Sequence, residues 1–215
     1  MQANRLAFAQ MVGVAAEKIV CCRQVHGTQV VAVDESHCGK GFLDGATAID
    51  HTDGLMTNVS GIGLWACFAD CTPLFFLDPV RRAIAVSHAG WRGTVAGIGA
   101  HTVQKMHEVY GSQPADILVG IGPSIGACHY EVDKPVIDKV QAAFGFWQQV
   151  LHFTAPGRAQ LDLWEANRLQ LLDAGVQAEH ITVSGLCTYC HAEDFYSYRR
   201  DNGHTGRMAA LLSLC

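Results

Sequence analysis

Residues 69–93, ADCTPLFFLDPVRRAIAVSHAGWRG, carry the pattern that decides the fold class. Pro73 to Leu77 and Ala83 to Ser87 are short apolar runs bounded by Asp, Pro or Gly, which is typical of buried strands. The GWRG sequence that follows them indicates the start of a helix, which we expect over Thr94 to Tyr110. The segment therefore predicts two successive strands followed by a helix.

Helix and strand patterns mix in the rest of the chain. We expect further strands at Lys18 to Cys22, Gln29 to Val33, Gly63 to Phe68, Ile117 to Ile121 and Ile181 to Ser184. We expect further helices at 2–12, Lys134 to Phe144 and Leu161 to Ala174, and a long loop over residues 34–60. Because several strands are consecutive, a mixed-sheet α/β (α+β) sandwich fits better than a doubly wound parallel sheet.

Composition excludes several classes of protein. The 215 residues are 49% hydrophobic and 16% charged, which supplies a sizeable core and excludes a disordered chain. With 15 Lys and Arg against 20 Asp and Glu, the net charge is −5, so we expect no nucleic-acid partner. No export signal and no apolar run of about 20 residues is present, so we expect a cytoplasmic protein without a membrane partner. No repeat or linker divides the chain, so we expect a single domain over residues 1–215.

The nine cysteines are an odd number in a chain with no export signal, so we expect reduced thiols. Cys187 and Cys190 form a CxxC motif, CTYC, which invites a redox or metal interpretation. The motif stands alone: no second CxxC completes a zinc site, and it does not open a helix after a strand. We therefore interpret these two thiols as structural.

Three short segments each place a metal-binding side chain near a strand end, close to a Gly or Pro bend. These side chains are His26 in QVHG, Cys71 in FADCTP and His88 in SHAGWRG. Two imidazoles and one thiolate suit zinc with a fourth position left open for water or substrate. The alternative is that Cys71 is a buried structural thiol and that both histidines are ordinary loop residues.

Arginines offer candidate anion sites in two places. Arg92 lies at the start of the helix after His88, where a guanidinium and free N–H groups suit phosphate or carboxylate. The alternative is a solvated arginine beside a core tryptophan. In the tail SYRRDNGHTGRM, Arg199, Arg200 and Arg207 surround an aspartate, which makes either a second anion-facing cluster or a salt-bridged surface turn.

Two carboxylates are candidate acids. Asp70 precedes Cys71, and Glu131 follows the sequence CHY. A carboxylate beside a metal ligand either carries protons or supports the ligand through a hydrogen bond. We take Asp70, together with Arg92, as a candidate catalytic residue.

Six segments, taken together and in order, resemble the laccase-domain family, also called the YfiH-type or polyphenol oxidase family. They are QVHGTQVVAVD, DGLMTN, ADCTPLFFLDP, AVSHAGWRGTVAGI, IGPSIGACHYEV and FYSYRRDNGHTGRM, and the likeness runs from about Asn4 to the C-terminus. The resemblance implies a YfiH-like fold and a zinc-dependent purine nucleoside enzyme. Such enzymes catalyse phosphorolysis of adenosine, inosine and methylthioadenosine, and deamination of adenosine. The resemblance also implies that the metal is held by His26, Cys71 and His88.

Two features depart from the family pattern. Relatives usually begin with a further strand and an Arg- and Gly-containing segment before the first helix, and we expect this chain to lack that segment. The loop between His26 and Cys71 is also longer, with extra His37, Cys38 and His51. These extra side chains are either spare metal ligands or solvated loop residues, and we take them as the latter.

The sequence leaves three functions open. In the first, zinc activates water for attack on C6 of adenosine, and Arg92, Arg199 and Arg207 hold phosphate for attack at C1′. In the second, copper replaces zinc and the substrates are phenols, although the chain lacks the paired HxH histidines of multicopper oxidases and would have to recruit His37, His51 or His129. In the third, the metal only stabilises a binding module.

Overall fold

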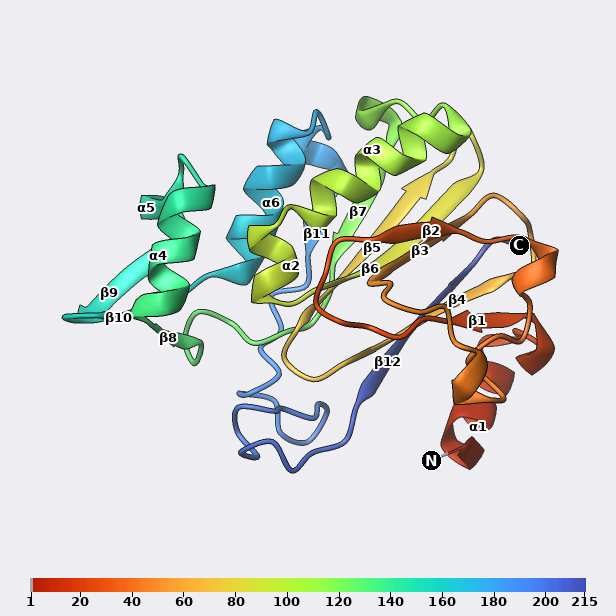
Figure 1. Ribbon diagram of the computed structural model, residues 1–215, viewed down its shortest axis with the longest axis horizontal. Helices are drawn as coiled ribbons and strands as arrows, with labels where there is room; N and C mark the ends of the chain where they lie inside the picture. The colour runs from red at the N-terminus through yellow and green to blue at the C-terminus, as the bar shows by residue number, and fades with distance from the viewer. Residues whose placement is uncertain (1) are drawn as a thin grey trace.

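A six-stranded sheet forms the centre of the computed structural model, which describes residues 2–215 (Figure 1). The spatial order of its strands is β11 (Ile181–Val183), β7 (Leu118–Ile121), β5 (Thr72–Asp78), β6 (Ala83–Ala89), β3 (Gly54–Thr57) and β2 (Val30–Ala32). The pairs β11–β7 and β2–β3 are parallel, whereas β7–β5, β5–β6 and β6–β3 are antiparallel. This mixture confirms the predicted mixed-sheet α/β class.

Strand β6 shows how the sequence builds the two faces of this sheet. Its small residues Ala83, Ala85 and Ala89 belong to the core under the helices α3 (Ile98–Tyr110) and α6 (Leu163–Asp173). The alternate residues Ile84 and Val86 belong to a different core on the opposite face. Side chains alternate along a strand, so His88 lies on the same face as Ile84 and Val86.

A second sheet covers that opposite face. It consists of β1 (Ile19–Cys21), β4 (Gly63–Phe68) and β12 (Met208–Ser213), with β4 in the centre. Leu64, Phe68 and Ala210 of this sheet share a core with Ile84 and Val86 of β6. Helix α1 (Gln2–Val12) packs on its outer side, where the Phe8 ring meets the Trp65 ring edge-on. The two sheets form the predicted sandwich.

A third group of elements forms a lobe at the end of the molecule farthest from α1 (Figure 1). It holds the small sheet β8–β10–β9, namely Glu131–Asp133, Arg158–Leu161 and Leu151–Ala155, with helices α4 (Lys134–Ala143) and α5 (Trp147–Val150). Helix α2 (Trp91–Val95) lies between this lobe and α3. Single turns of 3-10 helix occur at Ala16–Lys18, Glu35–His37, Gly45–Thr47, Pro114–Asp116 and Ala178–His180.

Several predicted elements are confirmed, and some predictions are wrong. The strand Gly63–Phe68 and the first helix have the predicted bounds. The helix predicted over Thr94 to Tyr110 is two helices, because Gly97 adopts a φ of 83° between α2 and α3. The loop predicted over residues 34–60 contains β3, whose four residues are all buried between β2 and β6. Strands β8, β9, β10 and β12 and helix α5 were not predicted.

None of the helices among residues 2–215 combines the length and the apolar character that a membrane span requires.

Candidate functional site

The register of β5 and β6 brings together the three side chains singled out in the sequence. Cys71 lies directly before β5, and His88 lies near the end of β6, where it is opposite Pro73. His26 reaches the same point from the connection between β1 and β2, where its φ is 62°. Donor atoms of all three side chains lie within 4.8 Å of one another, close enough to share one ion.

Asp53 fixes the geometry of this three-donor cluster. Its carboxylate is fully buried directly before β3, and it accepts hydrogen bonds from the backbone N–H groups of Val25 (3.1 Å), His26 (2.9 Å) and Gly27 (2.7 Å). Its Oδ1 also lies 2.9 Å from Nδ1 of His88. Because Nδ1 is engaged, Nε2 is the nitrogen that His88 offers to the cluster. Asp53 begins the segment DGLMTN, yet no role was predicted for it, because the strand that it precedes was predicted as part of a loop.

The pKa values of Cys71 and His88 are set by their neighbours at the cluster. Burial alone raises the pKa of the Cys71 thiol, but His26 and His88 together lower it to about 6. Burial alone lowers the pKa of His88, but Asp53 and Cys71 raise it to about 9. The pKa of Asp53 is held below its ordinary value, because hydrogen bonds from His88, Gly27 and Val25 outweigh burial. At neutral pH the cluster therefore holds a thiolate beside an imidazolium.

Donor chemistry and space both fit a metal ion. A thiolate is the form of cysteine that binds metals, and two imidazoles beside it suit a soft or borderline ion. A glycine stands where the chain passes the donors: a Cβ on Gly90 would lie 2.9 Å from Sγ of Cys71 and 2.9 Å from Cδ2 of His26. The φ of Gly90 is −69°, so steric room rather than backbone freedom explains glycine here. The cluster thus suggests metal binding.

The cluster opens into a cavity of about 570 Å³. Arg92, Arg199 and Arg207, which were predicted from the sequence as anion-binding residues, all line it. Each guanidinium lies over an aromatic ring of the cavity wall: Arg92 at 4.4 Å from the centre of Trp91, Arg199 at 5.1 Å from Tyr130 and Arg207 at 6.0 Å from Tyr198. Stacking orients a guanidinium and leaves its N–H edge open, so the walls suit an anion.

The three arginines are not equally committed to the protein. Arg199 donates from Nη1 to the Glu131 carbonyl (2.8 Å), and Arg207 donates from Nη1 to the Gly206 carbonyl (2.8 Å). Within residues 2–215, the guanidinium of Arg92 has no hydrogen-bond partner. Arg200 is not one of the cavity-lining residues, and it bonds Asp201 and backbone carbonyls instead. Arg92 is therefore the most available cation of the cavity.

The two candidate acids have other partners. Asp70 has a φ of 78° and lines the cavity, but Thr188 donates to its Oδ1 (2.6 Å) and the backbone N–H of Arg199 donates to its Oδ2 (2.7 Å). Both oxygens are thus engaged, which suits positioning better than proton transfer. Glu131 pairs with Arg158 (2.6 Å) and lies outside the set of cavity-lining residues.

Comparison with known families gives a match over the whole chain. The model of the family described as multi-copper polyphenol oxidoreductase laccase matches residues 1–215. The protein named purine nucleoside phosphorylase YlmD from Geobacillus stearothermophilus is 44% identical over 214 residues, which cover 97% of this chain and 77% of that protein. The protein named adenosine deaminase RL5, from an unknown prokaryotic organism, is 35% identical over 204 residues, covering 94% of this chain and 78% of that protein.

Solved structures show the same fold. The structure of the Bacillus licheniformis hypothetical protein YfiH matches with a TM-score of 0.97 at 39% identity, over 100% of this chain and 80% of that one. The structure of YlmD from Geobacillus stearothermophilus matches with a TM-score of 0.96 at 44% identity, over 99% of this chain and 79% of that one. The predicted YfiH-like fold is confirmed.

We expect Asp53→Asn to lower the affinity for divalent metal ions by about 10- to 100-fold, because the amide loses the charge and one of the acceptor oxygens that hold His88 and His26. Competition with a chromophoric chelator measures this, with zinc and with copper. Asp50→Asn is the matched control, since Asp50 is exposed and, among residues 2–215, its carboxylate forms ion pairs with only the exposed Arg23 and His51. Wild-type affinity in Asp53→Asn would contradict the role given to Asp53.

In metal-free protein we expect the Cys71 thiol to ionise with a midpoint near pH 6, well below the ordinary value of 9.0. Ultraviolet absorbance of the thiolate, taken as the difference between wild type and Cys71→Ser, measures the titration. His88→Asn should move the midpoint upward, since it removes a group that lowers this pKa while the thiol stays buried. A midpoint at or above pH 9 in the wild type would rule out the ion pair.

Proposed function

The chain belongs to the multi-copper polyphenol oxidoreductase laccase family, and on this premise we propose that it is a zinc-dependent purine nucleoside enzyme. The proposed reactions are phosphorolysis of adenosine, inosine and methylthioadenosine, and deamination of adenosine. Relatives named purine nucleoside phosphorylase and adenosine deaminase support both reactions. The observation that carries the proposal is the convergence of His26, Cys71 and His88 with three arginines on one cavity.

His26, Cys71 and His88 are the residues that would hold the metal ion. A bound zinc ion supplies Lewis acidity and lowers the pKa of water at such a site. The chain's own part is to hold the three donors in place: Asp53 orients His88, and the half-buried Cys71 thiolate stays ionised because both imidazoles lower its pKa. Three protein donors leave room for a further ligand, as expected of a catalytic rather than a structural site.

The arginines fit the second substrate of phosphorolysis. Phosphate has to approach C1′ while the purine leaves and positive charge develops on the sugar. Arg92 has its guanidinium N–H groups free for phosphate oxygens, with Arg199 and Arg207 lining the same cavity. Helix α2, which contains Arg92, is only five residues long, so we assign the binding to the guanidinium rather than to the helix dipole.

Two further residues that line the cavity, Tyr130 and Asp70, support the substrate-binding groups. Burial raises the pKa of the Tyr130 hydroxyl, and the nearby Cys71 thiolate raises it further, so Tyr130 stays protonated and serves as a neutral hydrogen-bond donor. Asp70 acts as a positioning residue, because its two oxygens hold Thr188 and the backbone of Arg199. The backbone of Arg199 is thereby held in the cavity wall.

A copper-dependent phenol oxidase is the second candidate, and the family's description favours it. This activity would need further histidine ligands beside the three-donor cluster. In the part of the chain that the structure describes, the cluster contains His26, Cys71 and His88 alone. His37 pairs with Asp34, and His51 pairs with Asp50. His129 belongs to a separate group of side chains. The nucleoside activity therefore has the better support.

Chromatography of adenosine incubated with the purified protein tests the proposal. We expect inosine without phosphate, and adenine in addition when phosphate is present. Cys71→Ala should abolish both products, because it removes the thiolate donor of the metal. Cys215→Ala is the matched control, since Cys215 is an exposed thiol that belongs to no group of potential metal donors among residues 2–215. Full phosphorolysis by metal-free Cys71→Ala protein would refute the proposal, whereas phenol oxidation with stoichiometric copper would establish the second candidate.

We expect Arg92→Ala to raise the KM for phosphate by about 10- to 100-fold, the loss of charge-assisted hydrogen bonds worth about 1.5–3 kcal/mol. Deamination does not use phosphate, so its rate in the same variant is the internal control and should change much less. Arg92→Lys should recover only part of the loss, because an ammonium is not planar. It can neither stack flat on Trp91 nor present the rigid pair of parallel N–H groups that a guanidinium offers to a phosphate. An unchanged KM for phosphate in Arg92→Ala would exclude Arg92 from the phosphate site.

A further inference from the structure

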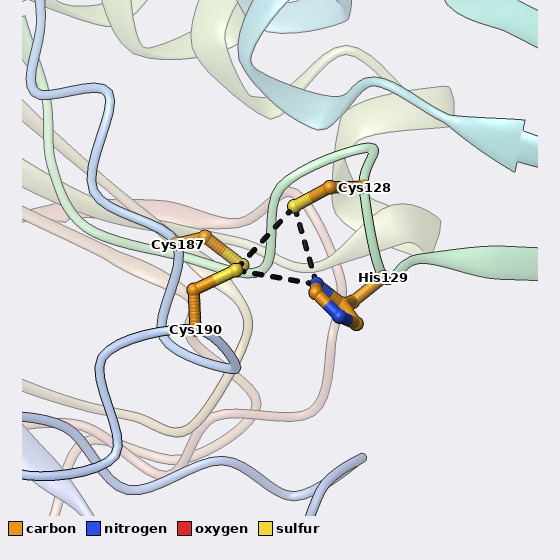
Figure 2. A group of neighbouring side chains, drawn as sticks. All are labelled: Cys128, His129, Cys187 and Cys190. Carbon is orange, nitrogen blue, oxygen red and sulfur yellow. Dashed lines mark hydrogen bonds between the residues drawn. The ribbon is translucent and has the colours of Figure 1, made fainter.

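A second group of metal-binding side chains lies outside the three-donor cluster. Cys128 and His129 are neighbours in the turn before β8, and Cys187 and Cys190 form the CTYC motif after β11. Figure 2 shows that the side chains of these four residues point toward one another from two separate loops. One donor atom from each lies within 4.8 Å of the other three. We call this group the Cys3His cluster.

The distances match those of ligands around one tetrahedral ion. Metal–sulfur bonds of about 2.3 Å and metal–nitrogen bonds of about 2.0 Å place two sulfurs about 3.8 Å apart, and a sulfur and a nitrogen about 3.5 Å apart. Here the sulfurs of Cys128 and Cys190 are 3.8 Å apart. The Nδ1 atom of His129 lies 3.3 Å from each of these two sulfurs. The spacing of these three donors therefore suits one ion, and a donor atom of Cys187 lies within 4.8 Å of each of them.

Neither apolar packing nor a disulfide accounts for the whole arrangement. Packing of thiols as small apolar groups does not explain it, because Cys128 and Cys190 are exposed and only Cys187 of the three is buried. A Cys128–Cys190 disulfide requires an S–S distance of about 2.05 Å and gives Cys187 and His129 no role. A metal ion uses all four side chains.

The surroundings hold the donors in the required orientation. The N–H of Gly126 donates to Sγ of Cys187 (3.2 Å), and the backbone of the CTYC turn closes with a hydrogen bond from the Cys190 N–H to the Cys187 carbonyl (3.1 Å). The ring of His129 stacks on Tyr189 with centres 4.0 Å apart and planes 12° apart. Such outer contacts are typical of built metal sites.

We propose that Cys128, His129, Cys187 and Cys190 bind a structural zinc ion that ties the two loops together. Three thiolates and one imidazole form a closed tetrahedral donor set, which differs from the three-donor cluster in leaving no position for substrate. The proposal does not depend on the proposed function.

The position of the Cys3His cluster shows what the ion would stabilise. Tyr130, which follows His129, lines the cavity. Thr188, which follows Cys187, donates to Asp70, and Asp70 in turn accepts from the backbone of Arg199. The loops that the ion joins are thus the loops that support one wall of the cavity.

The test uses the full chain carrying Cys71→Ala, which removes a donor of the three-donor cluster and isolates the Cys3His cluster. We expect about one zinc ion per chain in this protein by elemental analysis, the same in Cys71→Ala/Cys215→Ser, and none in Cys71→Ala/Cys190→Ser. Chelation should lower the Tm of the first two proteins and leave that of the third unchanged.

Cobalt gives a readout that does not depend on zinc content. Metal-free Cys71→Ala protein loaded with cobalt(II) should show thiolate-to-cobalt charge transfer and the intense visible bands of a tetrahedral ion. Cys190→Ser should abolish these bands, and His129→Asn should shift them, because it replaces the one nitrogen ligand. Circular dichroism checks that each variant is folded, and if Cys190→Ser is not, the His129→Asn spectrum decides.

Three results would overturn the proposal: no zinc and no cobalt bands in Cys71→Ala, unchanged cobalt bands in both folded variants, or a Cys128–Cys190 disulfide in freshly purified protein. Failure of the proposed function looks different. In that case nucleosides are not converted, while the zinc and cobalt results of the Cys71→Ala protein still hold.

Discussion

One buried carboxylate determines whether the candidate site exists. Asp53 accepts three successive backbone N–H groups of the loop that carries His26, and its Oδ1 lies 2.9 Å from Nδ1 of His88 on β6. A single side chain thus joins a loop to the central sheet. An ionised carboxylate without these partners would be costly in a fully buried position, so the loop and the histidine have to be in place when the protein folds. The positive φ of His26 is held by the same hydrogen bonds.

The parts of the fold that the sequence predicts are those with strong local signals. Gly63–Phe68 is an apolar run with clear ends, and its strand has the predicted bounds. The run predicted over Ala83 to Ser87 also forms a strand, but this strand continues to Ala89 and so includes His88. Strand β3 has no such signal: Gly54–Thr57 is short, follows a polar stretch, and forms a strand because β2 and β6 pair with it on both sides. The break at Gly97 has a local signal, a glycine with a φ of 83°, but a glycine inside a helical pattern does not by itself show that the helix ends.

In the candidate site, too, the features with local sequence signals were predicted and those that depend on tertiary structure were not. Residue type and strand ends suffice to single out His26, Cys71 and His88, and the sheet register then brings them together. Their roles as metal ligands remain predictions. The partners of Asp70 were not predictable, because Thr188 is 118 positions away in the chain and reaches Asp70 only through tertiary structure. The CTYC motif looks incomplete in the sequence for the same reason, since Cys128 and His129 come from a distant turn rather than from a second CxxC.

The two groups of donors differ in ways that suit different tasks. The three-donor cluster includes the buried His88, opens into the cavity and lies beside cations, so a ligand can enter from one side. The Cys3His cluster has four donors, lies mostly at the surface, and none of its members lines the cavity. The chain Cys187–Thr188–Asp70–Cys71 connects them through covalent bonds and one hydrogen bond of 2.6 Å. A metal ion that held the turn at Cys187 would therefore also hold the Thr188 hydroxyl that donates to Asp70, the residue before Cys71. The connection thus runs from a member of the Cys3His cluster, Cys187, to a member of the three-donor cluster, Cys71.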